Sequence, residues 1–279
     1  MFDILFIVTL ILFILTSIFS IMSLHSDNKI YVKETTFLFS LSVLSFLVMT
    51  ISMVYSSPSD GFNWIISSIW GFFYLFSLVL ILLIIYLYFS RWRHQLMPYN
   101  AFAIPLITIL LIISIPFIDS PRKIDTNFDH GLLLAHIFIT IFGELLFFFS
   151  FVGSVFYLFM ESQLKKKTSM KYIYRLSNLE SLEKFNRWTI SRAFILLTLG
   201  VIIGVKMAFI NFSSPFLGSP KEITIYFTWL IILGLYYFRC IKKIASHKVS
   251  ILNIIFFIVV MFLFIFSNIF ITSGFHSFK

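Results

Sequence analysis

Histidines are the residues of this chain best suited to chemistry, because neutral imidazole is the commonest metal ligand among side chains. The chain has six of them. Three lie in short segments rich in Lys and Arg, where solvated side chains are expected: His25, His94 and His247. The other three lie beside long apolar runs, away from those segments: His130, His136 and His276.

Two of the second group occupy positions suited to a shared site. His136 lies within the first two turns of one apolar run, and His276 lies just after the end of the last. If both runs cross a membrane, they deliver two imidazoles to the same face, as is needed to hold a planar haem from both axial sides. Helical geometry points His130 about 120° away from His136, so these two would not share one iron. From position alone, interfacial histidines without a ligand are the commoner case.

Two ionisable residues fall inside apolar runs. Glu144 comes eight residues after His136, on nearly the same expected helical face and two turns deeper. Lys206 lies close enough to the end of its run for its ammonium to reach the interface. Charged groups within a membrane are costly and usually face a protein interior or a wet cavity. Glu144 is therefore the better functional candidate, and no specific role follows for either residue.

Signatures of catalysis are absent from the sequence. It has no HExxH, no GxSxG, no phosphate-binding loop and no glycine-rich dinucleotide fingerprint. The single cysteine, Cys240, excludes a two-cysteine thiol–disulfide oxidoreductase. We therefore expect no enzyme activity and no catalytic residue.

The elements that carry these residues are membrane spans. Hydrophobic residues make up 59% of the 279 residues and charged residues 12%, too few charges to cover a soluble domain. Continuous apolar runs predict helices, so we expect an all-α polytopic membrane bundle forming one membrane domain over residues 1–279. Each expected span can cross a hydrocarbon core of about 30 Å. The eight are 4–22, 36–55, 63–90, 101–118, 132–160, 190–211, 223–240 and 250–272.

The distribution of Lys and Arg predicts the orientation. Of the 21 Lys and Arg residues, sixteen fall in four segments: 23–35, 91–100, 161–192 and 239–249. The positive-inside rule makes these segments cytoplasmic, so both termini are expected to be extracytoplasmic. The same clustering between apolar runs accounts for the net charge of +9 without a nucleic-acid partner.

The segment 161–189 is the largest expected cytoplasmic element. It begins with a lysine-rich stretch and continues with apolar residues spaced by three, from Leu176 to Trp188, with charges between them. This pattern predicts a short amphipathic helix lying on the membrane surface. A docking helix for a cytosolic partner is the alternative.

Three stretches resemble the CcsA/HemX-type cytochrome c assembly family, and the resemblance is strongest over 130–279. Leu-Ala-His-Ile-Phe-Ile at 134–139 is similar to the family's external histidine at the head of a helix. Ser-Pro-Lys-Glu at 219–222, with Thr-Trp-Leu at 228–230, is similar to the stretch that follows an external loop. Ser-Gly-Phe-His-Ser-Phe at 273–278 is similar to the closing motif with the second external histidine. In that family the two histidines are axial haem ligands, so the resemblance implies His136 and His276 as ligands to haem iron.

The chain also departs from the haem-handling members of that family. Their external loop is rich in tryptophan, whereas residues 205–220 contain none, and Ser219 stands where the family has Asp. Those members have an inner histidine where this chain has Tyr237, or Tyr236. These departures favour the HemX branch, which the resemblance associates with control of glutamyl-tRNA reductase levels in haem biosynthesis.

We therefore expect a HemX-like, non-catalytic regulator with an external bis-histidine haem site. The alternative is a CcsA-like haem-delivery component of cytochrome c maturation, and a third hypothesis is a small-solute transporter. The expected partners are the lipid bilayer, haem, and either a cytosolic haem-biosynthesis enzyme or other cytochrome c assembly proteins. The expected location is a bacterial cell (cytoplasmic) membrane.

The orientation can be tested with reporter fusions. Fusions after Lys165 and after Phe275 should report opposite sides of the membrane, with the second extracytoplasmic, because the Lys/Arg segments are held inside. Alkaline phosphatase and a cytoplasmic fluorescent reporter at each site make the measurement. The same side for both would refute the eight-span arrangement.

Overall fold

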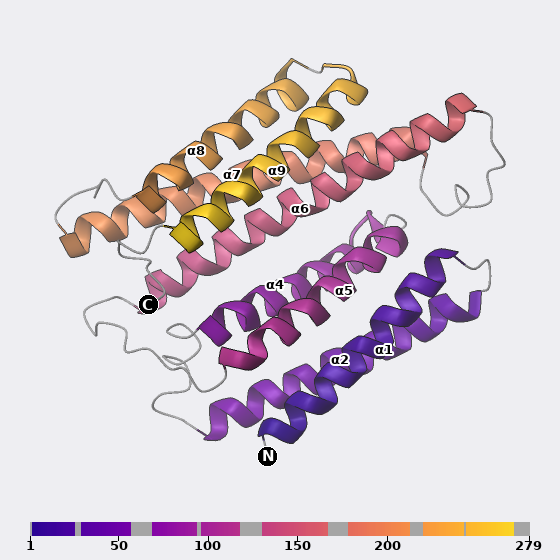
Figure 1. Ribbon diagram of the computed structural model, residues 1–279, viewed down its shortest axis with the longest axis vertical. Helices are drawn as coiled ribbons and strands as arrows, with labels where there is room; N and C mark the ends of the chain where they lie inside the picture. Colours follow the sequence, from indigo (N-terminus) through magenta and orange to yellow (C-terminus); the bar gives the residue numbers. More distant parts are fainter. Residues whose placement is uncertain are drawn as a thin grey trace. The chain divides into compact units, whose positions relative to one another are not determined.

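The computed structural model describes residues 2–25, 29–56, 69–93, 96–117, 130–166, 178–212, 220–242 and 244–270. These form long helices, shown in Figure 1. They are α1 (Phe2–His25), α2 (Lys29–Ser56), α4 (Ile69–Phe89), α5 (Leu96–Ser114) with the 3₁₀ turn η2 (Ile115–Phe117), α6 (His130–Lys166), α7 (Leu179–Phe212), α8 (Pro220–Tyr236) with the π-helical turn η4 (Tyr237–Ile241), and α9 (Ser246–Phe270).

The prediction of a polytopic helical membrane bundle is confirmed. In the described segments, eight helices are long and apolar enough to cross a membrane. Helices are the expected element because no water is available in hydrocarbon, so each backbone N–H and C=O must be paired within the segment. The orientation of these spans, with both termini outside, stays a prediction.

The chain divides into two compact units. The first comprises Met1–Thr126 with Lys171–Leu176, and the second comprises Asn127–Met170 with Ser177–Lys279. In the first unit α1 packs on α2 and α5, and α4 packs on α5. In the second unit α6 packs on α7 and α9, and α8 packs on α7 and α9. That the two units act as one membrane domain remains a prediction.

The first unit buries hydroxyl groups together with large apolar side chains such as Phe13, Phe46 and Trp70, and it exposes further large apolar side chains on its surface. Hydrogen bonds between hydroxyl groups join its helices. The hydroxyl oxygen of Thr9 on α1 lies 2.7 Å from that of Ser45 on α2, and the hydroxyl oxygen of Ser17 on α1 lies 2.7 Å from that of Thr108 on α5. The opposite face of α1 is exposed and aliphatic, with side chains that include Ile4, Ile7, Ile11 and Ile18. Lipid tails solvate such a face as well as a protein core does, so small residues and interhelical hydrogen bonds hold the helices together.

The second unit has a polar cluster that links three helices. Asn253 of α9 donates to the hydroxyls of Ser150 and Ser154 on α6, at 2.7 and 2.8 Å. Asn186 of α7 donates to Ser154 at 3.4 Å. All four side chains are buried. One turn away, Phe257 of α9 stacks on Phe151 of α6 with ring centroids 4.3 Å apart.

The segment 161–189 differs from the expected surface helix. Residues 161–166 complete α6, residues 167–177 lie outside the described part, and Leu179 begins a helix that continues to Phe212. The apolar positions Leu182, Phe185 and Trp188 are buried inside the second unit. Spacing by three marks a helix with one buried face, and packing within the protein covers that face as well as a membrane surface would.

Candidate functional site

His136 lies between α6 and α7, seven residues along α6, which begins at His130. Its Nδ1 is 2.9 Å from the backbone carbonyl oxygen of Gly200 on α7. A carbonyl oxygen only accepts, so the ring must carry its proton on Nδ1 and donate it to Gly200. The imidazole is partly buried, and its orientation is fixed by this single bond.

This hydrogen bond leaves Nε2 as the nitrogen with a free lone pair. No hydrogen bond joins Nε2 to any of the residues that the structure describes. Metal-binding histidines usually donate their other ring N–H to a carbonyl or carboxylate, which fixes the tautomer and raises the basicity of the ligand nitrogen. His136 therefore has the arrangement of an imidazole prepared to bind a metal through Nε2.

Two glycines on α7 make room for side chains of α6, one for His136 and the other for Thr140. A Cβ atom at Gly204 would lie 3.0 Å from Cε1 of His136, and one at Gly200 would lie 2.7 Å from Oγ1 of Thr140. The two glycines are four residues apart, so they present one smooth strip on α7. Such small-xxx-small strips let membrane helices approach closely. On α6, Gly143 faces Leu197 in the same way, at 2.7 Å.

The register of α9 against α6 indicates at which end of the second unit the segment that contains His276 begins. The two helices run antiparallel, because Glu161 pairs with His247, Ser154 with Asn253 and Phe151 with Phe257. Extending this register places the end of α9, at Phe270, level with His136. His276 follows six residues later and lies outside the described residues.

His247 belongs to the opposite end of the second unit. Its Nδ1 is 2.6 Å from Oε2 of Glu161. The other carboxylate oxygen of Glu161, Oε1, accepts a hydrogen bond from Lys165 at 2.8 Å. Glu161 follows His136 by 25 residues on the same helix, a distance of about 37 Å at 1.5 Å per residue. His247 thus cannot share a site with His136. Nothing is described of the side chains of the remaining histidines, His25, His94 and His130.

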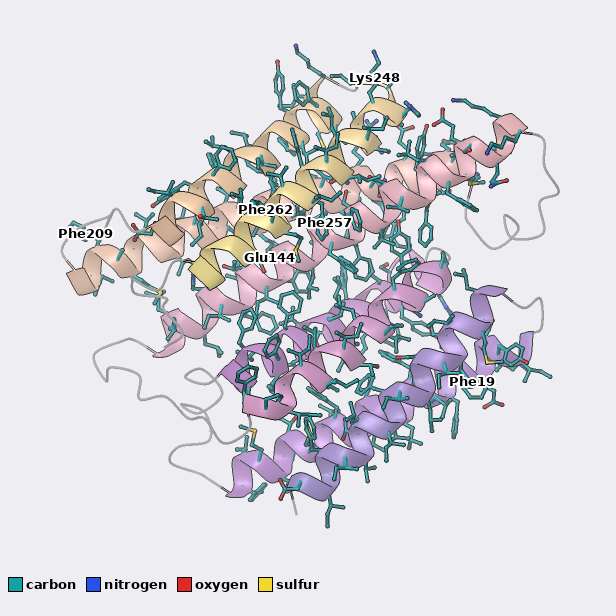
Figure 2. The ribbon with its side chains drawn as sticks, viewed as in Figure 1. Phe19, Glu144, Phe209, Lys248, Phe257 and Phe262 are labelled. Atoms are coloured by element: carbon teal, nitrogen blue, oxygen red, sulfur yellow. The ribbon has the colours of Figure 1, made fainter. Side chains whose placement is uncertain are left out.

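Glu144 and Lys206 are not joined to His136 by any described contact. Glu144 is partly buried and makes no hydrogen bond or ion pair within the described segments. Figure 2 shows it on α6 near Phe257 and Phe262 of α9, whereas His136 bonds to α7. Eight residues at 100° each separate the two directions by about 80°, and no described contact links the two side chains. Lys206 is exposed on α7, and its snorkelling role stays a prediction.

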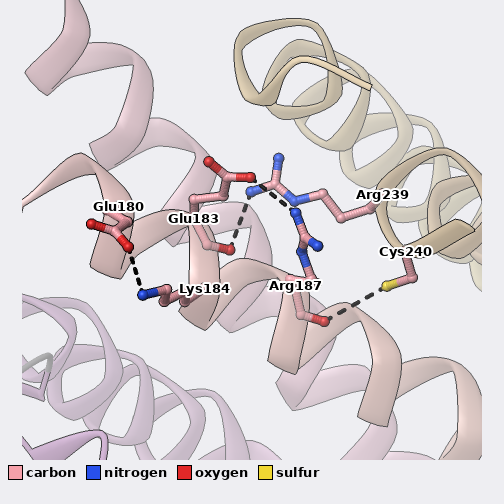
Figure 3. A network of polar contacts seen from close by, with 6 residues as sticks. All are labelled: Glu180, Glu183, Lys184, Arg187, Arg239 and Cys240. Carbon is pink, nitrogen blue, oxygen red and sulfur yellow. Dashed lines mark hydrogen bonds and ion pairs between the residues drawn. The ribbon is translucent and has the colours of Figure 1, made fainter. Parts of the chain in front are cut away.

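A buried arginine is the main feature that the sequence did not indicate. Arg239 lies in η4 and is only 1% exposed, although its position suggested a loop at the membrane surface. Its Nη2 donates to the carbonyl oxygen of Glu183 at 3.4 Å, while the Glu183 carboxylate pairs with Arg187 at 3.1 Å (Figure 3). Cys240 contacts the carbonyl oxygen of Arg187 at 3.9 Å. A π-helical turn redirects side chains by changing the residues per turn, and no sequence pattern marks it.

The two tyrosines in place of the family's inner histidine have separate packing partners. Tyr236 stacks on Phe194 of α7, with centroids 4.7 Å apart. Tyr237 points outward beneath the ammonium of Lys242, 5.4 Å from its ring. Within the described residues, no group of three or more His, Cys, Asp or Glu side chains could hold a metal ion. His136 therefore belongs to no such group among the described residues.

Comparison with known proteins identifies the family of this bundle of membrane helices. A family model described as cytochrome C assembly protein matches residues 66–276, well over half of the 279 residues. The chain belongs to the cytochrome c assembly protein family. The match runs from before α4 to beyond α9, whereas α1 and α2 precede it.

The chain is also similar to a known cytochrome c biogenesis protein. The cytochrome c biogenesis protein CcsA of Pyropia yezoensis is 34% identical over 104 residues, which is 37% of this chain and 32% of that protein. The matched stretch thus spans about a third of the relative's length. No solved structure matches the chain significantly.

The sequence-based preference for a HemX-type regulator is wrong. Both matches are to cytochrome c assembly and biogenesis proteins. The preference depended on local departures, namely a loop without tryptophan at 205–220 and a tyrosine at 237. The match extends over 66–276 and so covers α4 to α9, far more of the chain than that loop and that helical turn.

The close contact at Gly204 can be tested by substitution. Gly204→Ala should destabilise the second unit, because the new methyl must displace the imidazole that Gly200 holds, and overpacking costs about 1–3 kcal/mol. The thermal unfolding midpoint in detergent is the measurement. Gly234→Ala is the matched control, since nothing lies within 4 Å of its Cβ position, and it should be neutral or slightly stabilising. Equal effects of the two substitutions would contradict the described contact.

Proposed function

We propose that this membrane protein is a haem-delivery component of cytochrome c maturation, of the CcsA type. In this proposal Nε2 of His136 binds haem iron at the extracytoplasmic end of the second unit, and His276 binds the opposite axial position. The observation that carries the proposal is the Nδ1–H bond from His136 to Gly200, in a chain that belongs to the cytochrome c assembly family.

The antiparallel register of α6 and α9 supports the choice of His276. Because Phe270 ends α9 level with His136, a segment that follows it starts at the correct end of the unit. Six residues separate Phe270 from His276, and an extended chain of that length reaches about 20 Å. His247, at the other end of α9, is about 37 Å away from His136 along α6 and is unsuitable.

Haem is the cargo in this proposal, and the iron supplies the coordination sites that the imidazoles fill. In the proposal, the residues of this chain hold and orient the haem through His136. Gly200 fixes the tautomer of His136, and Gly204 leaves space for the imidazole ring. No residue is assigned a catalytic role. Other cytochrome c assembly proteins would act as partners, and a bacterial cytoplasmic membrane is the proposed location.

The proposal predicts which histidines cytochrome c maturation requires. In a strain that lacks the gene, the wild-type chain should restore haem-staining c-type cytochromes, while His136→Ala and His276→Ala should lower them at least tenfold. His247→Ala should restore them fully, because its imidazole lies at the other end of the unit. Staining of membrane fractions for covalent haem, normalised to the amount of the chain by immunoblot, gives the result.

Full restoration by His136→Ala, at normal abundance, would refute the proposed site. Equal loss with all three variants would show that the histidines act through stability. His136→Gly provides a further test, because imidazole in the medium should recover part of the staining if iron coordination is what was lost.

A further inference from the structure

The first unit contains a cavity that the proposed function does not use. It has a volume of about 470 Å³ and lies between α2 and α4, near the ends that adjoin the connections after α1 and α4. Its walls carry aliphatic and aromatic side chains of both helices together with a row of hydroxyls on α2, among them Thr35, Thr36 and Ser40. Its volume is in the range of small-molecule sites.

Beyond one end of the cavity, α2 and α4 are in contact through aromatic side chains. Away from the cavity, α2 and α4 meet at Phe46 and Tyr74, whose rings stack with centroids 5.0 Å apart. Trp70 continues the stack at 5.1 Å from Tyr74, and Thr50 bonds to the Tyr74 hydroxyl. Val43, one turn before Phe46, is the last residue of α2 that lines the cavity. The two helices are thus held together at one end and separated at the other.

The open end carries a positive charge. Arg93, which follows α4, lines the cavity, and its guanidinium lies 4.4 Å from the centre of the Tyr88 ring. Its Nη2 donates to the Tyr88 hydroxyl at 2.8 Å, which holds the side chain at the rim. A guanidinium has five N–H donors, so most remain for an anion. Nearby, the amide oxygen of Asn100 also lines the cavity and has no hydrogen-bond partner among the described residues.

The dimensions suit one leaflet of a bilayer. Along α2 the lining extends from Val32 to Val43, about 16 Å at 1.5 Å per residue. Half of a hydrocarbon core is about 15 Å thick. An acyl chain that entered beside Phe89 would therefore reach the aromatic stack while its headgroup stayed level with Arg93.

We propose that this cavity binds an anionic phospholipid whose headgroup carries hydroxyl groups, such as phosphatidylglycerol. The acyl chain lies between α2 and α4, the phosphate contacts Arg93, and a headgroup hydroxyl donates to Asn100. Among the described residues that line the cavity there is no histidine, methionine or cysteine, and the hydroxyl of Tyr88 accepts a hydrogen bond from Arg93. The inference does not depend on the proposed haem site, which lies in the other unit.

Native mass spectrometry of the delipidated full chain tests the proposal. Phosphatidylglycerol should bind with one tightly held molecule per chain and at least fivefold better than phosphatidylcholine of the same acyl chains. Arg93→Gln should remove most of that preference. Arg91→Gln is the matched control, because Arg91 stacks on Trp92 at 5.0 Å and does not line the cavity. Ser40→Trp should block the groove and reduce binding of both lipids.

Each remaining outcome would overturn the assignment. Equal losses with Arg91→Gln and Arg93→Gln would indicate general attraction to a charged surface. Binding of glycerol phosphate as strong as that of the lipid would indicate an anion site without an acyl chain. One-for-one displacement of the lipid by haem, with loss of haem binding in Arg93→Gln, would make haem the occupant. If Ser40→Trp fails to fold, the Arg91 and Arg93 pair still decides.

Discussion

The close approach of α6 and α7 is the contact on which the candidate site depends. Hydrocarbon does not drive apolar helices together, so these two need surfaces that fit at short range. Gly200 and Gly204 provide such a surface, and Thr140 and His136 of α6 lie against it. The same approach brings the Gly200 carbonyl within 2.9 Å of the imidazole. The contact between α6 and α7 therefore sets both the packing of these two helices and the tautomer of the His136 imidazole.

The rest of the second unit keeps that contact in place through polar groups. Asn253 ties α9 to α6, and Trp229 of α8 donates to Thr198 of α7 at 3.0 Å. At the other end, Arg239 binds the start of α7 through the Glu183 carbonyl. An interhelical hydrogen bond in a membrane protein contributes about 0.6 kcal/mol to stability on average. Each of these bonds is therefore weak, and it is their combined contribution that stabilises the unit. Their directionality also fixes which residues of each helix face inward.

Sequence alone predicted the helical membrane architecture and the eight spans, because runs of Phe, Ile and Leu have no other stable form in lipid. It also singled out His136 from its position near the start of an apolar run. It did not predict that Gly200 orients His136, since that contact joins residues 64 apart and depends on the angle at which two helices meet.

Other features were not predicted from the sequence, because their residue patterns have two interpretations. The apolar spacing from Leu182 to Trp188 suits a membrane surface as well as an internal helix contact, and the structure buries it. Arg239 counted toward the positive loops, although a π-helical turn brings it inside. The absence of tryptophan from 205–220 and the tyrosine at 237 pointed to the wrong branch, because these local departures were weighed above the similarity that extends over 66–276.

Magnetic resonance of the ferric haem complex tests the central claim, that Nε2 of His136 is prepared to bind iron. The full chain would be purified with ¹⁵N-labelled histidine, loaded with haem, and studied by electron–nuclear double resonance. The account predicts a low-spin signal with couplings from two imidazole nitrogens, and Gly204→Ala should alter the coupling of one of them. A high-spin signal, or a low-spin signal without imidazole couplings, would contradict it.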